Sequence, residues 1–180
     1  MEGLNTQNRL AEKEGKKNTH QEIKDDLLSE SISFASFRDK LIELDQSDSS
    51  RTKSIDNLEL LKDEDVTNFI FSKNDLELEK KYKNLLSFTE FHVGQIKLSS
   101  KDEDGVAHIK EALNLAEESE ADNRWINYLK GTYLYLNNQE IPEDILDGAK
   151  DMGNNSRILE SFNKGLKERG YPDYLVDYKF

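Results

Sequence analysis

Cysteine is absent from the 180-residue sequence, and proline occurs only twice, at Pro142 and Pro172. Without cysteine the chain forms no disulfide, no thiolate nucleophile and no cysteine-based zinc site. With so few prolines, nearly all of the backbone is free to be helical. No apolar run approaches the roughly 20 residues that a membrane-spanning helix needs, and the first residues lack the apolar core of a signal peptide. We therefore expect a cytoplasmic protein.

Apolar residues are also scarce. They make up 35% of the sequence and charged residues 34%, against roughly 45–50% and 25% in typical globular domains. The formal net charge is −12, which repels the phosphates of nucleic acids and the surface of anionic membranes. We therefore expect neither a nucleic-acid partner nor a membrane partner. A protein or peptide partner, basic in character, fits this charge.

The amino-terminal third divides into two segments by composition. Residues 1–19 are polar and poor in apolar side chains, which predicts a disordered or loosely helical segment. From His20 to Leu44, apolar residues recur at spacings of three and four, which predicts one amphipathic helix. Residues 45–54, DQSDSSRTKS, have the composition of a linker. Residues 20–54 are thus a helix with a linker, and residues 55–180 are predicted to form a helical-repeat domain.

The remainder of the chain reads as a series of helices, and sustained period-two patterns typical of strands are missing. We predict an all-α fold. Capping residues mark several helix starts: Asp65 for a short helix, Asn74 or Asp75 for a long helix, and Asp122 or Asn123 for the helix carrying Trp125. Apolar periodicity places the helices at Leu58 and Leu61, at 66–70, from 75 to about 98, at 106–118, at 125–137, at 141–149 and at 156–166.

Three glycines lie inside predicted helices, although a mid-helix glycine costs roughly 1 kcal/mol relative to alanine. A large side chain lies six residues before each glycine and an aromatic one lies three before it, on one inclined ridge of the helix. A bare glycine lets a neighbouring helix approach and cover those side chains. The three sets are Phe88, Phe91 and Gly94; Trp125, Tyr128 and Gly131; and Leu159, Phe162 and Gly165. We expect stacked helix hairpins.

The segments HVGQ at 92–95, GVAHIKEAL at 105–113 and WINYLKGT at 125–132 resemble tetratricopeptide repeats. More narrowly, they resemble uncharacterised bacterial soluble proteins with tetratricopeptide-like helices. The resemblance covers about residues 75–175 and implies an α-solenoid of stacked antiparallel helix hairpins. It further implies a non-catalytic scaffold for protein–protein interaction. Where the repeat consensus has tryptophan, four residues before each glycine, the chain has Glu90, Asn127 and Ser161, so no groove residue is transferred from the family.

Residues capable of acid–base or metal chemistry follow no diagnostic spacing. If 88–98 and 106–118 form a hairpin, His92 and His108 are expected to face each other, while Glu90 lies on another face of the helix from His92. No metal-binding, phosphate-binding or nucleophile motif is present, so we expect no catalytic residue, no metal and no cofactor. Gln95 is expected to bond a loop carbonyl. The candidate partner- or ligand-binding residues are His92, Gln95, Trp125 and Tyr128.

Three functions remain open from the sequence. The first is a non-catalytic protein-binding scaffold of unknown pathway. The lack of catalytic motifs favours a protein that is not an enzyme. The second is a small-ligand or metal-binding regulator, or an enzyme, with a pocket near His92 and Gln95. The third is an assembly component that uses helix 20–44 as a docking arm. The last residues, YPDYLVDYKF, are expected to cap the last hairpin. The sequence does not specify the oligomeric state.

Overall fold

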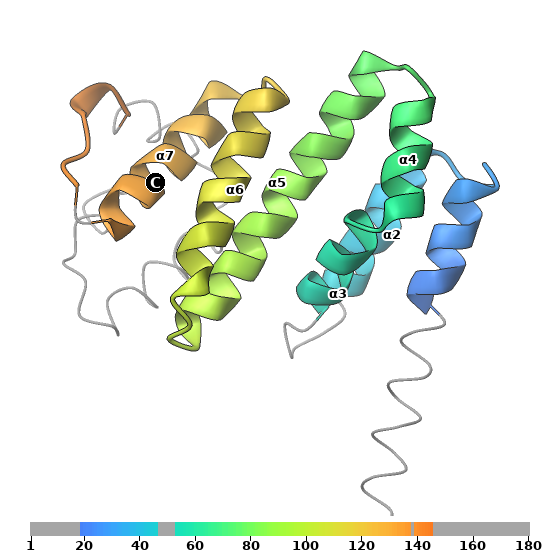
Figure 1. Ribbon diagram of the computed structural model, residues 1–180, viewed down its shortest axis with the longest axis horizontal. Coiled ribbons are helices and arrows are strands. Elements are labelled where there is room, and N and C mark those ends of the chain that lie inside the picture. Colours follow the sequence, from blue (N-terminus) through green and yellow to red (C-terminus); the bar gives the residue numbers. More distant parts are fainter. Residues whose placement is uncertain (1–18, 47–52, 138, 146–180) are drawn as a thin grey trace, which may run out of the picture. The chain divides into compact units, whose positions relative to one another are not determined.

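The computed structural model describes residues 19–46, 53–137 and 139–145, and within these ranges every regular element is a helix (Figure 1). The all-α prediction is confirmed for this part of the chain. The chain divides into two compact units, between Leu78 and Glu79. The predictions for residues 1–18 and for 146–180, including Gly165 and the final YPDYLVDYKF, lie outside the described residues.

Unit 1 contains a helix over residues 19–28, α2 (Phe34–Gln46), α3 (Lys53–Leu61) and α4 (Glu64–Ser72). Each helix presents apolar residues at three- and four-residue spacing, so each has one apolar face to bury. The predicted linker 45–54 is shorter than expected, since α2 extends to Gln46 and α3 begins at Lys53. The buried apolar side chains are Ile23, Leu27, Phe37, Leu41, Leu58, Leu60, Leu61, Val66 and Ile70.

The prediction of one continuous helix from His20 to Leu44 is wrong, because the chain turns at residues 29–33. Glu30 has a φ of 58°, in the left-handed region, and the amide of Ser31 donates to the carbonyl of Asp26 at 2.9 Å, which closes the first helix. Ser33 then starts α2 by accepting a hydrogen bond from the amide of Ser36 at 3.2 Å. The apolar spacing of three and four residues continues across this turn, so periodicity alone did not reveal it.

The N-cap of α4 is Asp63 and not the predicted Asp65. The Asp63 carboxylate accepts hydrogen bonds from the amides of Asp65 at 3.0 Å and Val66 at 3.4 Å. The hydroxyl of Thr67 donates to the carbonyl of Asp63 at 2.9 Å. The two bonds to the carboxylate satisfy amides that a helix start leaves without an intrahelical partner.

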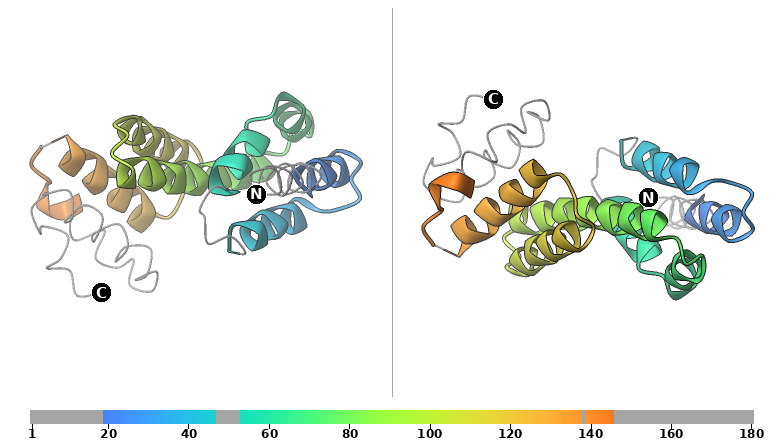
Figure 2. Two further views of the ribbon diagram at one scale, coloured as in Figure 1. Left: turned by 90° about the horizontal axis from the view of Figure 1, so that it is seen from below. Right: turned by 90° about the horizontal axis from the view of Figure 1, so that it is seen from above.

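Unit 2 contains α5 (Leu76–Ser99) from Glu79 onward, α6 (Asp104–Glu118) and α7 (Asn123–Leu136), which lie side by side (Figures 1 and 2). The predicted cap Asp75 is confirmed, because its carboxylate accepts from the amides of Glu77 and Leu78. Asp122 is also confirmed as the cap of α7, with the amide of Arg124 at 2.9 Å. The Arg124 side chain binds the same carboxylate and lowers the pKa of Asp122 to about 2. The helix predicted from Val106 begins two residues earlier, at Asp104.

The antiparallel pair α5 and α6 crosses where two glycines meet. A β-carbon on Gly94 would lie 2.9 Å from Cδ1 of Ile109, 3.0 Å from the carbonyl oxygen of Gly105 and 3.2 Å from Cβ of His108. The predicted role of Gly94, to let a neighbouring helix approach, is therefore confirmed. Gly131 is also helical and buried, in α7. The sequence reasoning did not anticipate Gly105, which occupies the same crossing from the α6 side.

Candidate functional site

A buried hydroxyl joins the three helices of unit 2. Ser87 of α5 donates its hydroxyl hydrogen to the carbonyl of Ala112 in α6 at 2.7 Å. The same oxygen accepts a hydrogen bond from the indole Nε1 of Trp125 in α7 at 3.0 Å. A buried indole N–H needs a partner, and Ser87 supplies it. This arrangement fixes the position of Trp125 relative to both other helices.

One turn further along α5, Glu90 and His108 form a buried carboxylate–imidazole pair. Glu90 is fully buried, and its Oε2 lies 2.5 Å from Nδ1 of His108, whose side chain is 22% exposed. An ionised carboxylate only accepts hydrogen bonds, so with Glu90 ionised Nδ1 of the imidazole is the donor. This bond fixes the orientation of the ring. It uses Nδ1 and does not involve Nε2, the other ring nitrogen. The sequence reasoning named Glu90 but did not pair it with His108.

His92 and Gln95 also lie on α5. That His92 and His108 face each other stays a prediction; the imidazole of His108 contacts the carboxylate of Glu90. His92 is half-buried and packs edge-on against Phe91, with 6.2 Å between ring centroids. The predicted bond from Gln95 to a loop carbonyl is not formed: its buried Nε2 has no hydrogen-bond partner among the described residues. The role of His92 and Gln95 as binding residues stays a prediction.

Trp125 and Tyr128 lie in an aromatic cluster with two phenylalanines of α5. Phe91 meets Trp125 at 5.2 Å and Tyr128 at 5.6 Å between ring centroids, both edge to face. Trp125 and Tyr128 are buried, so they contribute to packing. Phe88 was expected to face inward but is 38% exposed. Its ring stacks on Trp125 at 4.4 Å with 21° between the planes, so a rigid aromatic surface reaches solvent at this point.

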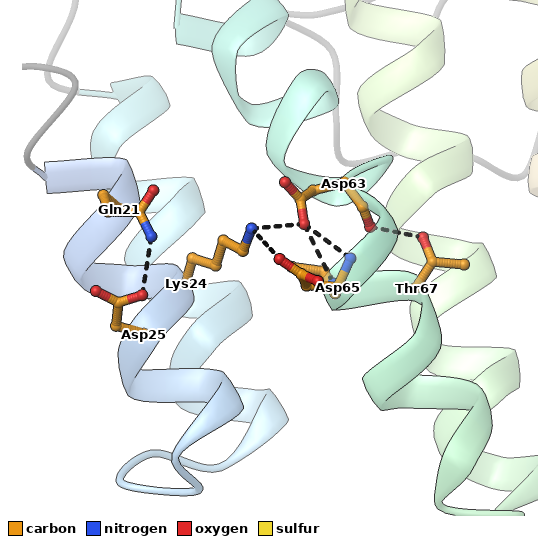
Figure 3. A network of polar contacts seen from close by, with 7 residues as sticks. Gln21, Lys24, Asp25, Asp63, Asp65 and Thr67 are labelled. Carbon is orange, nitrogen blue, oxygen red and sulfur yellow. Dashed lines mark hydrogen bonds and ion pairs between the residues drawn. The ribbon is translucent and has the colours of Figure 1, made fainter.

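Unit 1 has its own polar cluster, centred on Lys24 (Figure 3). The Lys24 ammonium lies 2.7 Å from Oδ1 of Asp63 and 2.8 Å from Oδ2 of Asp65. The hydrogen bond to Asp63, followed by that to Asp65, raises the pKa of Lys24 above its ordinary value. The bond to Lys24 in turn lowers the pKa of Asp63. The network thus ties the helix over 19–28 to the residue that caps α4.

Within residues 19–46, 53–137 and 139–145, no group of three or more histidine, aspartate or glutamate side chains is placed to hold a metal ion. No helix in the same ranges has the length and apolar character needed to cross a membrane. Comparison with protein-family models, with curated proteins and with solved structures found no match for this chain.

Proposed function

We propose that the protein is a non-catalytic scaffold for protein–protein interaction, built from tetratricopeptide-like helix hairpins. In this proposal α5 and α6 are one hairpin and α7 opens the next. The close crossing at Gly94 and Gly105 supports the proposal. So does the way α7 packs on α5 through Phe91 and Trp125, since a repeat buries its apolar ridge only against its neighbours.

The observation that carries the proposal is the exposed ring of Phe88 stacked on Trp125. Binding energy at protein interfaces concentrates in a few aromatic and arginine anchors, and these work best when they are rigid before binding. The stack on Trp125, which Ser87 holds in place, gives Phe88 this rigidity. The net charge of −12 favours a basic protein or peptide as the partner.

Affinity capture with the purified chain tests this function. Wild type and Phe88→Ser are immobilised, exposed to lysate of the source cell at low and at physiological salt, and the retained proteins are identified. We expect a reproducible partner that Phe88→Ser loses and that weakens as salt rises. Phe71→Ser is the matched control, because Phe71 is 39% exposed but lies in unit 1. Identical retention by all three proteins, or nothing reproducible at low salt, contradicts the proposal.

A second candidate function is a ligand- or metal-binding regulator or an enzyme, and the Glu90–His108 pair favours it. Carboxylates that bind Nδ1 of histidine orient many metal-ligating and catalytic imidazoles. This function predicts that a divalent metal ion or a metabolite raises the melting temperature. A thermal-shift screen of such compounds on wild type and His108→Ala tests it, because a compound bound at this pair loses its effect on the variant. No hit on wild type removes its support.

A further inference from the structure

The helix over residues 19–28 is attached to the rest of unit 1 by a patterned set of contacts. His20 Nε2 lies 2.9 Å from Oδ1 of Asn57 in α3. Beyond the Lys24 network, Oδ2 of Asp26 lies 3.0 Å from Nζ of Lys40 in α2. Just after the helix, Oε1 of Glu30 lies 2.7 Å from the ammonium of Lys73, which follows α4. These contacts place the helix against α2, α3 and α4.

The apolar contribution comes from two side chains one turn apart. Ile23 is 5% exposed and Leu27 is 1% exposed, and residues four apart share one face of a helix. Lys24 and Asp26 lie between them. Along this helix the order is an apolar residue (Ile23), a lysine (Lys24), a carboxylate (Asp26) and a second apolar residue (Leu27). The other helices of unit 1 contact all four side chains. This is a specific chemical pattern for a helix in a groove.

The contacts that hold the first helix are of a kind that another helix can replace. The helix is followed by Glu30, whose left-handed backbone conformation makes the turn to α2. The pair of Asp26 with Lys40 is exposed on both sides and contributes little stability, so the Lys24 network is the main polar attachment of the helix.

Among the remaining helices, Phe37, Leu61 and Val66 are completely buried with the first helix in place. The side-chain amide of Asn57 in α3 also donates to the carbonyl of Leu41 in α2 at 3.0 Å. This bond does not involve the first helix, so it can persist when that helix opens.

We propose that the helix over 19–28 occupies in cis a helix-binding site formed by α2, α3 and α4, and that a partner protein's helix with the same chemical pattern displaces it. The helix is then an autoinhibitory element. The partner helix carries two apolar residues four positions apart, a lysine after the first that reaches Asp63 and Asp65, and a carboxylate before the second that reaches Lys40. The site lies in unit 1 and does not depend on Phe88, so it can fail while the scaffold function stands.

A single thiol measures whether the helix opens by itself. The chain has no cysteine, so Leu27→Cys and Leu41→Cys each introduce one buried thiol, the first on the displaceable helix and the second on α2. We expect the thiol at position 27 to react with a disulfide reagent at least about tenfold faster than that at position 41. Adding Lys24→Ala accelerates the first reaction and not the second. Equal rates at the two positions overturn the proposal, because they show only joint opening of the unit.

A peptide measures whether the emptied site accepts a helix. The probe is a fluorescein-labelled synthetic peptide with the sequence of residues 19–30, THQEIKDDLLSE, and its binding to the full chain is followed by anisotropy. Leu27→Ala, which loosens the cis helix, is expected to bind the probe at least about tenfold more tightly than wild type, because apparent affinity scales with the fraction of open sites. Leu41→Ala, checked for helicity by circular dichroism, is the control and gains no affinity.

The charge pattern has its own control. A second peptide with lysine and carboxylate exchanged at positions 24 and 26 keeps the same composition, and we expect it to bind at least about tenfold more weakly. Equal binding of the two peptides, or of the probe to Leu27→Ala and wild type, overturns the proposal. Elution of Leu27→Ala as a dimer overturns the assignment to a partner protein, because a second copy then supplies the helix.

Discussion

Gly105 of α6 touches the backbone of α5 so closely that a β-carbon on it would lie 2.7 Å from the carbonyl oxygen of Gly94 and 2.9 Å from the amide nitrogen of Leu98. Both atoms belong to a helix backbone, which cannot rotate away as a side chain can. The two helices therefore hold this distance only while residue 105 has no side chain.

Gly105→Ala is expected to lower the free energy of unfolding by about 1–3 kcal/mol, the usual cost of overpacking a filled interior. The measurement is urea denaturation followed by far-ultraviolet circular dichroism. Gly94→Ala is expected to cost less, because its nearest contact is Cδ1 of Ile109, the end of a flexible side chain. A gain in stability on Gly105→Ala, as helix propensity alone would give, contradicts the close crossing.

The Glu90–His108 pair predicts a loss of folding stability on removal of one partner, and a recovery when both partners are replaced. His108→Ala leaves the buried Glu90 carboxylate without its imidazole and is expected to cost about 3 kcal/mol, the lower end of the range for breaking a buried pair, because His108 is 22% exposed. The double variant Glu90→Leu with His108→Leu removes both polar groups and is expected to recover most of this loss. Denaturation of wild type, Glu90→Leu, His108→Leu and the double variant gives the coupling energy. A double variant as unstable as the sum of the single ones refutes the pair.

The left-handed backbone of Lys101 predicts that substitution by glycine raises stability there, whereas the same substitution inside a helix lowers it. Its φ of 64° is left-handed, a conformation that costs a residue with a β-carbon roughly 1 kcal/mol and glycine almost nothing. Lys101→Gly is therefore expected to raise the free energy of unfolding, by up to about 1 kcal/mol. Lys110→Gly, at an exposed position inside α6, is expected to lower it by about 1 kcal/mol. The same sign for both substitutions contradicts the left-handed assignment.

The Lys24 network predicts a dependence of stability on pH. The folded-state pKa of Asp63 lies below its ordinary value of 3.8, so the carboxylate stabilises the fold fully above about pH 4. This contribution is lost as the pH falls through the lowered folded-state pKa. Asp63→Asn keeps a capping side chain but lacks the charge. It is expected to have a lower urea midpoint than wild type at pH 7, and the difference should shrink below pH 4.

Asp39→Asn serves as the control for that measurement, because Asp39 pairs with the adjacent exposed Arg38 on the same helix and contributes little. Its midpoint is expected to equal that of wild type at pH 7. A difference between wild type and Asp63→Asn that stays constant from pH 7 to pH 3 contradicts the role assigned to Lys24.

Apolar periodicity and caps were enough to predict the helical class and several helix starts. Asp75 and Asp122 were recognised because their carboxylates precede apolar stripes. Helix ends were harder, because glycine is the usual left-handed residue after a helix. Here Glu30, Asn74, Lys101 and Glu120 adopt that conformation. The turn at Glu30 therefore carried no signal, and two helices were predicted as one.

The polar groups of unit 2 were the least predictable. Glu90 and Ser87 are buried, whereas Phe88 between them is exposed, against the ordinary preference of these residue types. Glu90 is buried because His108 comes to it from a helix eighteen residues on, and Ser87 because Trp125 needs an acceptor. Such pairings depend on the crossing of α5 and α6, which the spacing along one helix does not reveal. Gly94 gave the only advance indication of that crossing.

The burial of Trp125 has a consequence for spectroscopy. It is the only tryptophan in the sequence, and it lies in unit 2 against Phe88, Phe91 and Tyr128. Intrinsic fluorescence excited at the red edge of the absorption band therefore reports on unit 2 alone, while unit 1 is silent. Melting curves from tryptophan emission and from far-ultraviolet circular dichroism coincide only if the two units unfold in one cooperative transition.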